Sequence, residues 1–255
     1  RPSCEAVKRR QDRFAEGCKP EPERFPGLVA AEVLCMTLAQ AVGLAVPPVS
    51  RRLVGGKPCL MVQRYDRTVG PDGMVRRIHQ EDFCQAMGFP PERKYQQEGG
   101  PLLRDCIAML REWSTAPVLD IRDFLSGVMF NTVIGNADAH GKKYSLLYRE
   151  DERRLAPFYD LVCTLAWPEL SKTPAMKIGQ SDSLDSIQPA HWQRMTQEAR
   201  LGWPQVRERL ARLCRTVQTA LSEPSLRQAT GDDAMFDRLA GIVRKRSSSL
   251  LQALA

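Results

Sequence analysis

The sequence predicts an α+β, helix-rich fold of two lobes, with a small N-terminal lobe over residues 1–67 and a larger, mostly helical lobe over residues 68–255. Three observations predict it. Two strand-like runs flank a Gly55-Gly56 turn, a second pair of strands follows residue 143, and apolar residues recur at helical spacing through most of the remaining chain. No apolar run reaches the length of about 18 residues that crosses a membrane.

Composition narrows the class of protein. Over 255 residues, 43% hydrophobic and 26% charged residues are ordinary for a globular protein with a substantial core. The eight cysteines lack a CxxC spacing, and Cys35, Cys84 and Cys106 fall in apolar helical patterns, so we expect free thiols in a reducing cytoplasm. The net charge of +7 is spread along the chain, which favours a mildly basic solvated surface over a nucleic-acid arm. We expect no signal peptide, and the start at Arg1 rather than Met predicts a fragment or a processed chain.

The small lobe is expected to combine one buried helix with short strands. Apolar residues over 27–43 form a broad face, and Gly43 ends the pattern, so this segment is predicted to be a helix. Strands are predicted over 47–54 and 57–63. Glu32 lies near the start of the helix, where a favourable charge at a helix N-terminus is one explanation for it.

The larger lobe is predicted to be built from helices. A short helix is expected over residues 80–87, with Glu81 and Asp82 in its first turn. The remaining helices are predicted over residues 102–113, 121–134, 189–201, 204–221 and 232–255, of which the last three close the chain. The helix over 121–134 should be central and buried, because its C-terminal end leads into the polar loop described next.

Residues 130–160 organise the chain. A polar loop over 135–143 is followed by a strand over 144–148, a charged turn and a second strand over 155–158. This hairpin should bring Asp138 close to Asp160, so that one cleft holds two carboxylates, an imidazole and two ammonium groups. Phosphoryl transfer needs such a layout: one Asp for the acceptor hydroxyl, one for Mg²⁺, and a cation for the phosphates. The alternative explanation is a solvated polar loop. A metal hydrolase is disfavoured because no HxH or HxxxH pair occurs.

Several blocks of sequence resemble a known family. GNADAHGKKYSLL, followed by LAPFYDLV, resembles the catalytic loop and metal-binding segment of HipA-type serine/threonine kinases, the toxin halves of bacterial toxin–antitoxin pairs. PGLVAAEVLCMTLAQAVGLAVPPV, MVQRYDR, IHQEDFCQAMGFPPERKYQQEGGP and PAMKIG also resemble family blocks and occur in the family's order. The resemblance is strong over about residues 19–201 and implies a two-lobed, protein-kinase-like fold with a truncated N-terminal lobe.

The resemblance also implies a role for individual residues. Asp138 would be the catalytic base and Asp160 the Mg²⁺ ligand, while Lys19, paired with Glu32, would hold the nucleotide phosphates. The further residues implied to bind the nucleotide are Gln63, Arg64 and Tyr65 of the hinge, and His140, Gly141, Lys142, Lys143 and Tyr159 around the catalytic loop.

Two departures from the family put catalysis in question. Five residues after the catalytic Asp, kinases carry an Asn that binds the metal, whereas this chain has Lys143, whose ammonium has no lone pair to donate. The Gly-rich phosphate loop is also missing from residues 1–18. We therefore expect weak binding of Mg²⁺–ATP and keep a second hypothesis, a degenerate, non-catalytic relative that binds a nucleotide or a protein. A third, a plain helical interaction protein, is disfavoured by the density of family blocks.

The implied cofactors are ATP and Mg²⁺. The implied partners are a protein substrate, which in this family is often an aminoacyl-tRNA synthetase, and a DNA-binding antitoxin. Any contact with DNA would then be indirect, through the antitoxin, and the protein would be cytoplasmic with no membrane association.

Overall fold

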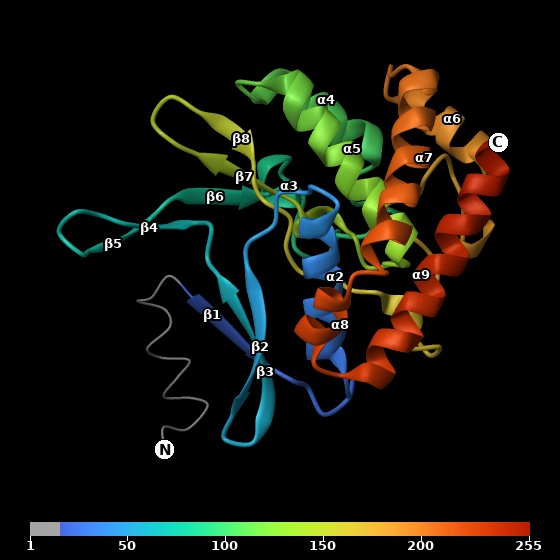
Figure 1. The fold of residues 1–255 in the computed structure, drawn as a ribbon. Helices are drawn as coiled ribbons and strands as arrows, with labels where there is room; N and C mark the ends of the chain where they lie inside the picture. The colour runs from blue at the N-terminus through green and yellow to red at the C-terminus, as the bar shows by residue number, and fades with distance from the viewer. Residues whose placement is uncertain (1–15) are drawn as a thin grey trace.

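A computed structural model of the chain describes residues 16–255. Figure 1 shows a small sheet on one side, a bundle of helices on the other, and one helix, α2, between them. This is the helix-rich α+β arrangement that the sequence predicts. The predicted boundary between the two lobes at residue 67 stays a prediction. So does the missing Gly-rich loop, since residues 1–15 lie outside the described residues.

The small sheet carries the first site residue. Its strands are β1 (Glu16–Pro20), β2 (Val49–Val54) and β3 (Lys57–Gln63), all antiparallel in the order β1-β3-β2. Lys19 on β1 is opposite Leu60 on β3, and Leu60 is fully buried. Gly55 and Gly56 have φ of 61° and 83°, the left-handed backbone that a two-residue hairpin turn uses. The two strands predicted about this turn are confirmed.

Helix α2 (Leu28–Ala41) is covered on both faces. Val29 and Val33 pack against Leu60 of the small sheet, while Leu34 and neighbouring side chains belong to the main core. A helix buried on both sides needs no polar face, which explains why its apolar pattern is so broad. Glu32 lies in this apolar helix and is only 6% exposed, so its carboxylate requires a partner.

A second sheet holds the predicted hairpin. Strands β6 (His79–Asp82), β7 (Ser145–Tyr148) and β8 (Arg153–Leu155) are antiparallel in the order β6-β7-β8. The hairpin β7–β8 is confirmed, although its second strand ends at Leu155 rather than at residue 158. The amide of Ala156 still donates to Ser145 of β7 at 2.8 Å, and the chain then leaves the sheet, because the amide of Phe158 donates to the carbonyl of Ala45 at 2.8 Å.

The helix predicted over residues 80–87 is wrong in its first half. Residues 79–82 form β6, paired with β7, and only α3 (Phe83–Ala86) is helical. Asp82 caps α3: its side chain accepts from the amide of Gln85 at 2.8 Å, and the Gln85 side chain accepts from the amide of Asp82 at 2.9 Å. Asp82, which was predicted to lie in the first turn of the helix, is therefore its N-cap residue. A further hairpin, β4 (Arg67–Val69) with β5 (Val75–Arg77), was not predicted.

The larger lobe is a helical bundle. Its helices are α4 (Leu103–Trp113), α5 (Pro117–Ile134), α6 (Pro189–Glu198), α7 (Trp203–Ala220), α8 (Pro224–Thr230) and α9 (Asp233–Leu254). Helix α5 starts about a turn earlier than predicted, because Pro117 suits the first turn of a helix. Four helices, rather than the three predicted, close the described chain after residue 188, because the short α8 precedes α9. Helix α8 lies beside α2 (Figure 1). Helix α5 is central and buried, as predicted.

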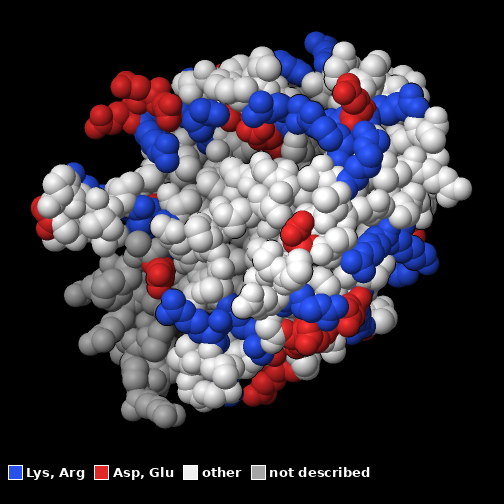
Figure 2. Space-filling model, viewed as in Figure 1, with Lys and Arg blue, Asp and Glu red and all other residues white. Residues whose placement is uncertain are grey.

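The surface shows no concentrated charge on the face in view. Figure 2 shows lysine and arginine side chains in separate groups with acidic side chains among them, which agrees with the expected mildly basic surface. Within residues 16–255, no helix combines the length and the apolar character needed to cross a membrane.

Candidate active site

The loop that carries Asp138 is held rigidly at the end of α5. Gly135 ends the helix with φ 78°, a left-handed conformation that favours glycine, and Asn136 donates to the Asn131 side chain at 2.8 Å. The Asn136 side chain in turn accepts from the amide of Asp138 at 3.0 Å. The amide of Ala137 donates to the Thr164 hydroxyl at 2.8 Å. These bonds fix the backbone of Asp138 from both sides.

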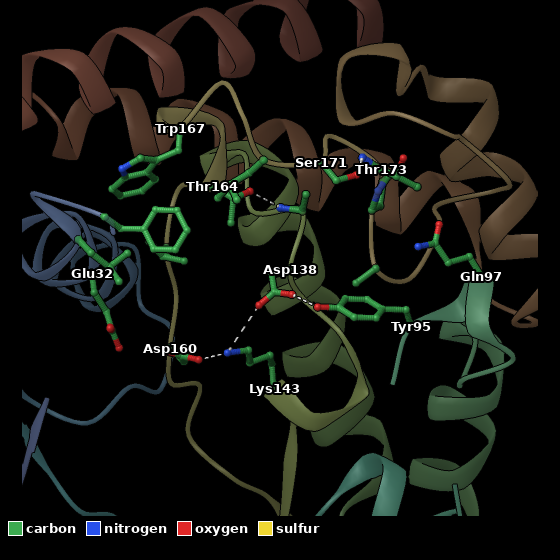
Figure 3. Close-up of a pocket in the computed structure, with 17 residues that line it drawn as sticks. Glu32, Tyr95, Gln97, Asp138, Lys143, Asp160, Thr164, Trp167, Ser171 and Thr173 are labelled. Atoms are coloured by element: carbon green, nitrogen blue, oxygen red, sulfur yellow. Dashed lines mark hydrogen bonds and ion pairs between the residues drawn. The ribbon is translucent and has the colours of Figure 1, made fainter. Parts of the chain in front are cut away.

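The Asp138 carboxylate faces a cleft and has three polar neighbours (Figure 3). The Tyr95 hydroxyl donates to Oδ1 at 2.7 Å. Lys143 Nζ lies 3.8 Å from Oδ2, and His140 Nε2 lies 3.8 Å from Oδ1. The side chain remains 40% exposed, so an incoming hydroxyl group can still reach it.

Asp160 is contacted by ammonium groups from both lobes. Lys19 of β1 donates to Oδ1 at 2.9 Å, and Lys143 of the catalytic loop contacts Oδ2. Lys19 also donates to Glu32 of α2 at 3.0 Å, so the expected pairing of these two residues is present. Asp160 has φ 57°, an unusual backbone for a residue other than glycine, although aspartate tolerates it better than most. Such strained residues occur often in functional sites.

One ammonium thus joins the two carboxylates. Because Lys143 contacts both Asp138 and Asp160, the two face one cleft, and the prediction that the hairpin brings them together is confirmed. Burial lowers the pKa of the Lys143 ammonium, and the Asp138 carboxylate opposes that change. The charge on Lys143 is therefore partly desolvated and depends on its two carboxylate partners.

His140 is buried and neutral at physiological pH. Burial is the main cause that lowers the pKa of its imidazole to about 4; Asp138 opposes this change in part, and the nearby Lys143 ammonium adds to it. The ring stands edge-on to Tyr95, with centroids 5.2 Å apart. Within the described chain its Nδ1 atom has no hydrogen-bond partner. His140 therefore presents a neutral ring to Asp138 rather than a phosphate-binding cation.

The remaining predicted residues surround this cluster. Gln63 ends β3, Arg64 is bonded to Asp66 at 2.9 and 2.7 Å, and the Tyr65 ring stacks on Tyr159 with centroids 5.9 Å apart. Tyr65 therefore packs against the segment that precedes Asp160.

Two catalytic-loop residues act through backbone and packing. The Tyr159 hydroxyl donates to the carbonyl of Lys142 at 2.9 Å and bonds to Ser145 at 2.7 Å, which ties the loop to β7. A Cβ atom at Gly141 would lie 2.7 Å from Pro101 and 2.8 Å from the Cys84 sulfur, so the loop requires a glycine here.

A cavity of about 430 Å³ opens beside the carboxylates. Of the predicted residues, Glu32, Asp138, Lys143 and Asp160 line it. Lys19, the hinge residues 63–65, residues 140–142 and Tyr159 are not among its lining residues.

Sequence reasoning missed Tyr95 and the segment over residues 162–175, both of which line this cavity. Tyr95 stands in a block, KYQQEGG, that resembles the family, and that block was the available signal.

The grouping of these residues can support proton abstraction and the binding of an anion. Asp138 is exposed and bonded in a fixed orientation, as a general base requires. Lys19 and Lys143 bring two positive charges to the same point, where phosphate groups would be stabilised. A plain interaction protein with a solvated loop does not account for a lysine buried between two carboxylates.

The family follows from the sequence match. Residues 15–221 match the family described as the HipA-like C-terminal domain. The chain belongs to this family. The match includes β1 with Lys19, the catalytic loop and Asp160, so every residue of the candidate site lies inside it.

Relatives with kinase names share this HipA-like region. Y4mE of Sinorhizobium fredii, named as a kinase, is 47% identical over 204 residues, covering 80% of this chain and 49% of its own length. The serine/threonine-protein kinase toxin HipA of Shewanella oneidensis is 32% identical over 228 residues, covering 82% of this chain and 52% of its own length. The chain thus spans about half the length of these relatives.

Solved structures confirm the kinase-like fold. HipA of Shewanella oneidensis, in complex with HipB and its operator DNA, superposes with a TM-score of 0.85 at 25% identity, covering 94% of this chain and 59% of that one. The Helicobacter pylori proinflammatory kinase CtkA gives a TM-score of 0.60 at 13% identity, covering 93% of this chain and 85% of its own, which is a likeness of fold alone.

The donor atoms fit Mg²⁺ only in part. Mg²⁺ in phosphoryl-transfer sites is bound by one or two carboxylates together with substrate phosphates and waters, and Asp160 supplies such a carboxylate. Among residues 16–255 no group of three His, Cys, Asp or Glu side chains could hold a metal ion without such phosphates. Both Asp160 oxygens already contact an ammonium, so a metal bound there would compete with Lys19 at one oxygen or with Lys143 at the other.

Proposed function

We propose that the protein is a HipA-like serine/threonine kinase that transfers the γ-phosphate of ATP to a hydroxyl group of another protein. The observation that carries this proposal is the convergence of Asp138, Asp160 and the Lys19–Glu32 pair on one cleft. Kinases use these groups, in this combination, to orient the acceptor, bind the metal and hold the phosphates. The membership of the chain in the HipA-like family supports the same assignment.

Each residue then has a defined task. Asp138 accepts the proton of the attacking hydroxyl group through its exposed oxygen, while the Tyr95 hydroxyl keeps the other oxygen oriented. Lys19 neutralises phosphate charge, and Glu32 holds its ammonium at the required position. Residues 63–65 provide backbone groups for the adenine ring. Tyr159 ties the loop in place, while Gly141 lets it pack closely.

Mg²⁺ would be held by Asp160 together with the phosphates of ATP. When bound, the metal neutralises charge on the transferred phosphoryl group. Lys143 occupies the position of the second metal ligand of kinases and supplies a fixed positive charge there. A lysine can bind phosphate oxygens directly as a point charge, so it replaces part of the metal's task.

The alternative is a non-catalytic relative that binds a nucleotide or a protein. The observation that favours it is the same Lys143, which occupies both carboxylates and leaves neither free for a metal. In that case the cleft would retain its anion-binding groups, Lys19 and Lys143, but would lack phosphoryl transfer.

The partners are proposed from the relatives. HipA of Shewanella oneidensis is named a toxin, and its structure is a complex with HipB and operator DNA. By analogy, we propose a DNA-binding antitoxin as partner, with DNA contacted only through it, and a cytoplasmic protein substrate such as an aminoacyl-tRNA synthetase.

The test is transfer of labelled γ-phosphate from Mg²⁺–ATP to the protein itself and to a library of serine and threonine peptides. Transfer that is lost in Asp138→Asn would support the kinase. Binding of ATP by calorimetry without any transfer would favour the non-catalytic alternative. If the protein neither binds ATP nor transfers phosphate, the kinase and the nucleotide-binding form of the alternative are both wrong, and a protein-binding role is what remains.

A further inference from the structure

The cavity beside Asp138 extends away from the side where the nucleotide is expected. One end of it is formed by Asp138, Lys143 and Asp160, while the hinge residues 63–65 and Lys19 do not line it. The other end is formed by Trp167 (Figure 3), and the lining also includes Leu28 at the start of α2 and Phe25 just before it. The cavity therefore connects the catalytic base to an apolar wall.

The wall is held by packing within the protein. Trp167 is 7% exposed and stands edge-on to Phe25, with ring centroids 6.0 Å apart. A wall that is already packed loses little conformational entropy when a ligand covers it. The volume of about 430 Å³ lies within the range of specific ligand pockets, which is roughly 300–1,000 Å³.

The segment that carries this wall is tied to the catalytic loop. The amide of Ala175 donates to the carbonyl of Ala137 at 2.8 Å, next to Asp138. The carbonyl of Ala175 accepts from the amide of Gln96 at 2.9 Å, next to Tyr95. Nearer the wall, the amide of Trp167 donates to the carbonyl of Thr164 at 3.1 Å, and the Thr164 hydroxyl accepts from the amide of Ala137 at 2.8 Å, so both ends of the segment are bonded to the loop that carries the base.

The charges in the cavity are already neutralised. Glu32 and Asp160 are paired with Lys19, and Lys143 contacts both Asp160 and Asp138. No carboxylate of the lining is therefore left to attract a basic side chain strongly. What remains for recognition is the apolar surface of Trp167 and its neighbours, together with neutral polar side chains such as Gln97, Ser171 and Thr173.

We propose that this cavity is the acceptor subsite, and that it selects a protein segment with a bulky apolar side chain next to the phosphorylated serine or threonine. This inference rests on the proposed kinase function. An acceptor hydroxyl has to come within about 2.6–3.2 Å of Asp138, and the cavity opens at that carboxylate. A neighbouring leucine or phenylalanine then lies against Trp167 and Leu170, at the opposite end of the same space.

The experiment compares serine peptides that carry leucine, phenylalanine, alanine or lysine at each position flanking the serine. We expect a kcat/KM at least about tenfold higher for leucine or phenylalanine at one position, the size of effect that apolar pockets produce. In Trp167→Ala and in Leu170→Ser this preference should fall below twofold, through KM for the peptide, with binding of ATP unchanged. Trp203→Ala, a half-buried tryptophan at the start of α7, is the matched control and should keep the preference.

A binding experiment distinguishes a failure of this inference from a failure of the proposed kinase function. Labelled peptides are titrated against Asp138→Asn and read by fluorescence polarisation, which needs no catalysis. Leucine or phenylalanine peptides that bind more tightly than alanine peptides, and lose that advantage in Trp167→Ala, would support the subsite even if no transfer occurs. A preference that is absent, or that survives both wall variants, would overturn it. Displacement of the peptide by adenosine, with weaker ATP binding in Trp167→Ala, would also overturn it, since the cavity would then belong to the nucleotide.

Discussion

Replacing Lys143 with asparagine should change how the protein depends on Mg²⁺. In the wild type, the Lys143 ammonium contacts Asp160, the proposed metal ligand, and also lies 3.8 Å from Asp138. Asparagine would remove the positive charge and offer a carbonyl oxygen, which is a ligand that Mg²⁺ accepts. We therefore expect Lys143→Asn to bind Mg²⁺–ATP more tightly and to transfer phosphate faster.

The size of the effect follows from the geometry. A metal bound to Asp160 would stand about 2.1 Å from its oxygen, and hence about 4 Å from a lysine ammonium that stayed nearby. At an effective dielectric constant of about 20, a +1 and a +2 charge at about 4 Å repel by roughly 8 kcal/mol before relaxation. If movement of the side chain removed four-fifths of that repulsion, about 1.6 kcal/mol would remain, which is more than about tenfold in Mg²⁺ affinity.

The assay is the rate of autophosphorylation against Mg²⁺ concentration, in parallel with thermal unfolding with and without Mg²⁺. The half-saturating Mg²⁺ concentration should fall at least about tenfold in Lys143→Asn. Without metal this variant should be less stable than wild type, because Asp138 and Asp160 lose the ammonium group between them and only Lys19 still pairs with Asp160, and Mg²⁺ should restore the loss. Lys57→Asn makes the same change of charge at a side chain that is 69% exposed on the small sheet, and should behave as wild type. Equal activity and equal Mg²⁺ saturation in wild type and Lys143→Asn would mean that residue 143 is not at the metal position.

Three further outcomes are expected. Tyr95→Phe removes the hydrogen bond to Asp138 and should lower kcat about tenfold, the loss expected for a bond to a charged group, with binding of ATP and the melting temperature unchanged. The pKa of His140 is lowered from 6.5 to about 4, so between these pH values the unfolded chain binds a proton that the folded chain does not. The unfolding free energy of wild type should therefore fall, relative to that of His140→Gln, as the pH is lowered from 6.5 to about 4, and urea titrations measure this difference. Gly135→Ala should destabilise by about 1–2 kcal/mol or more, because φ is 78° and a Cβ would lie 2.8 Å from Leu165, whereas Gly241→Ala on α9 meets open space and should be neutral or stabilising.

The part of the site that the sequence predicts is the part built by local structure. The hairpin β7–β8 lies between Asp138 and Asp160, and a short hairpin necessarily returns the chain to its starting point. The apolar periodicity of α2 and α5 likewise follows from burial and is visible in the sequence.

The missed features depend on contacts between distant segments. Tyr95 reaches Asp138 from 43 residues away, and β6 joins a hairpin that lies more than 60 residues further along the chain. Neither contact leaves a periodic signal in its own segment. Helix α8 has only seven residues, too few for an amphipathic pattern, and it is stabilised by packing rather than by propensity.

Asp160 contacts both Lys19 of the small sheet and Lys143 of the catalytic loop, so a single carboxylate bridges the two halves of the cleft. Any phosphate group that enters must compete with this carboxylate for both lysines. The contact between Asp160 and the two lysines therefore opposes the binding of an anion, and ligand affinity is lowered by the strength of that internal contact. A change that weakens this contact at Asp160, and leaves both lysines in place, frees their charges for the anion.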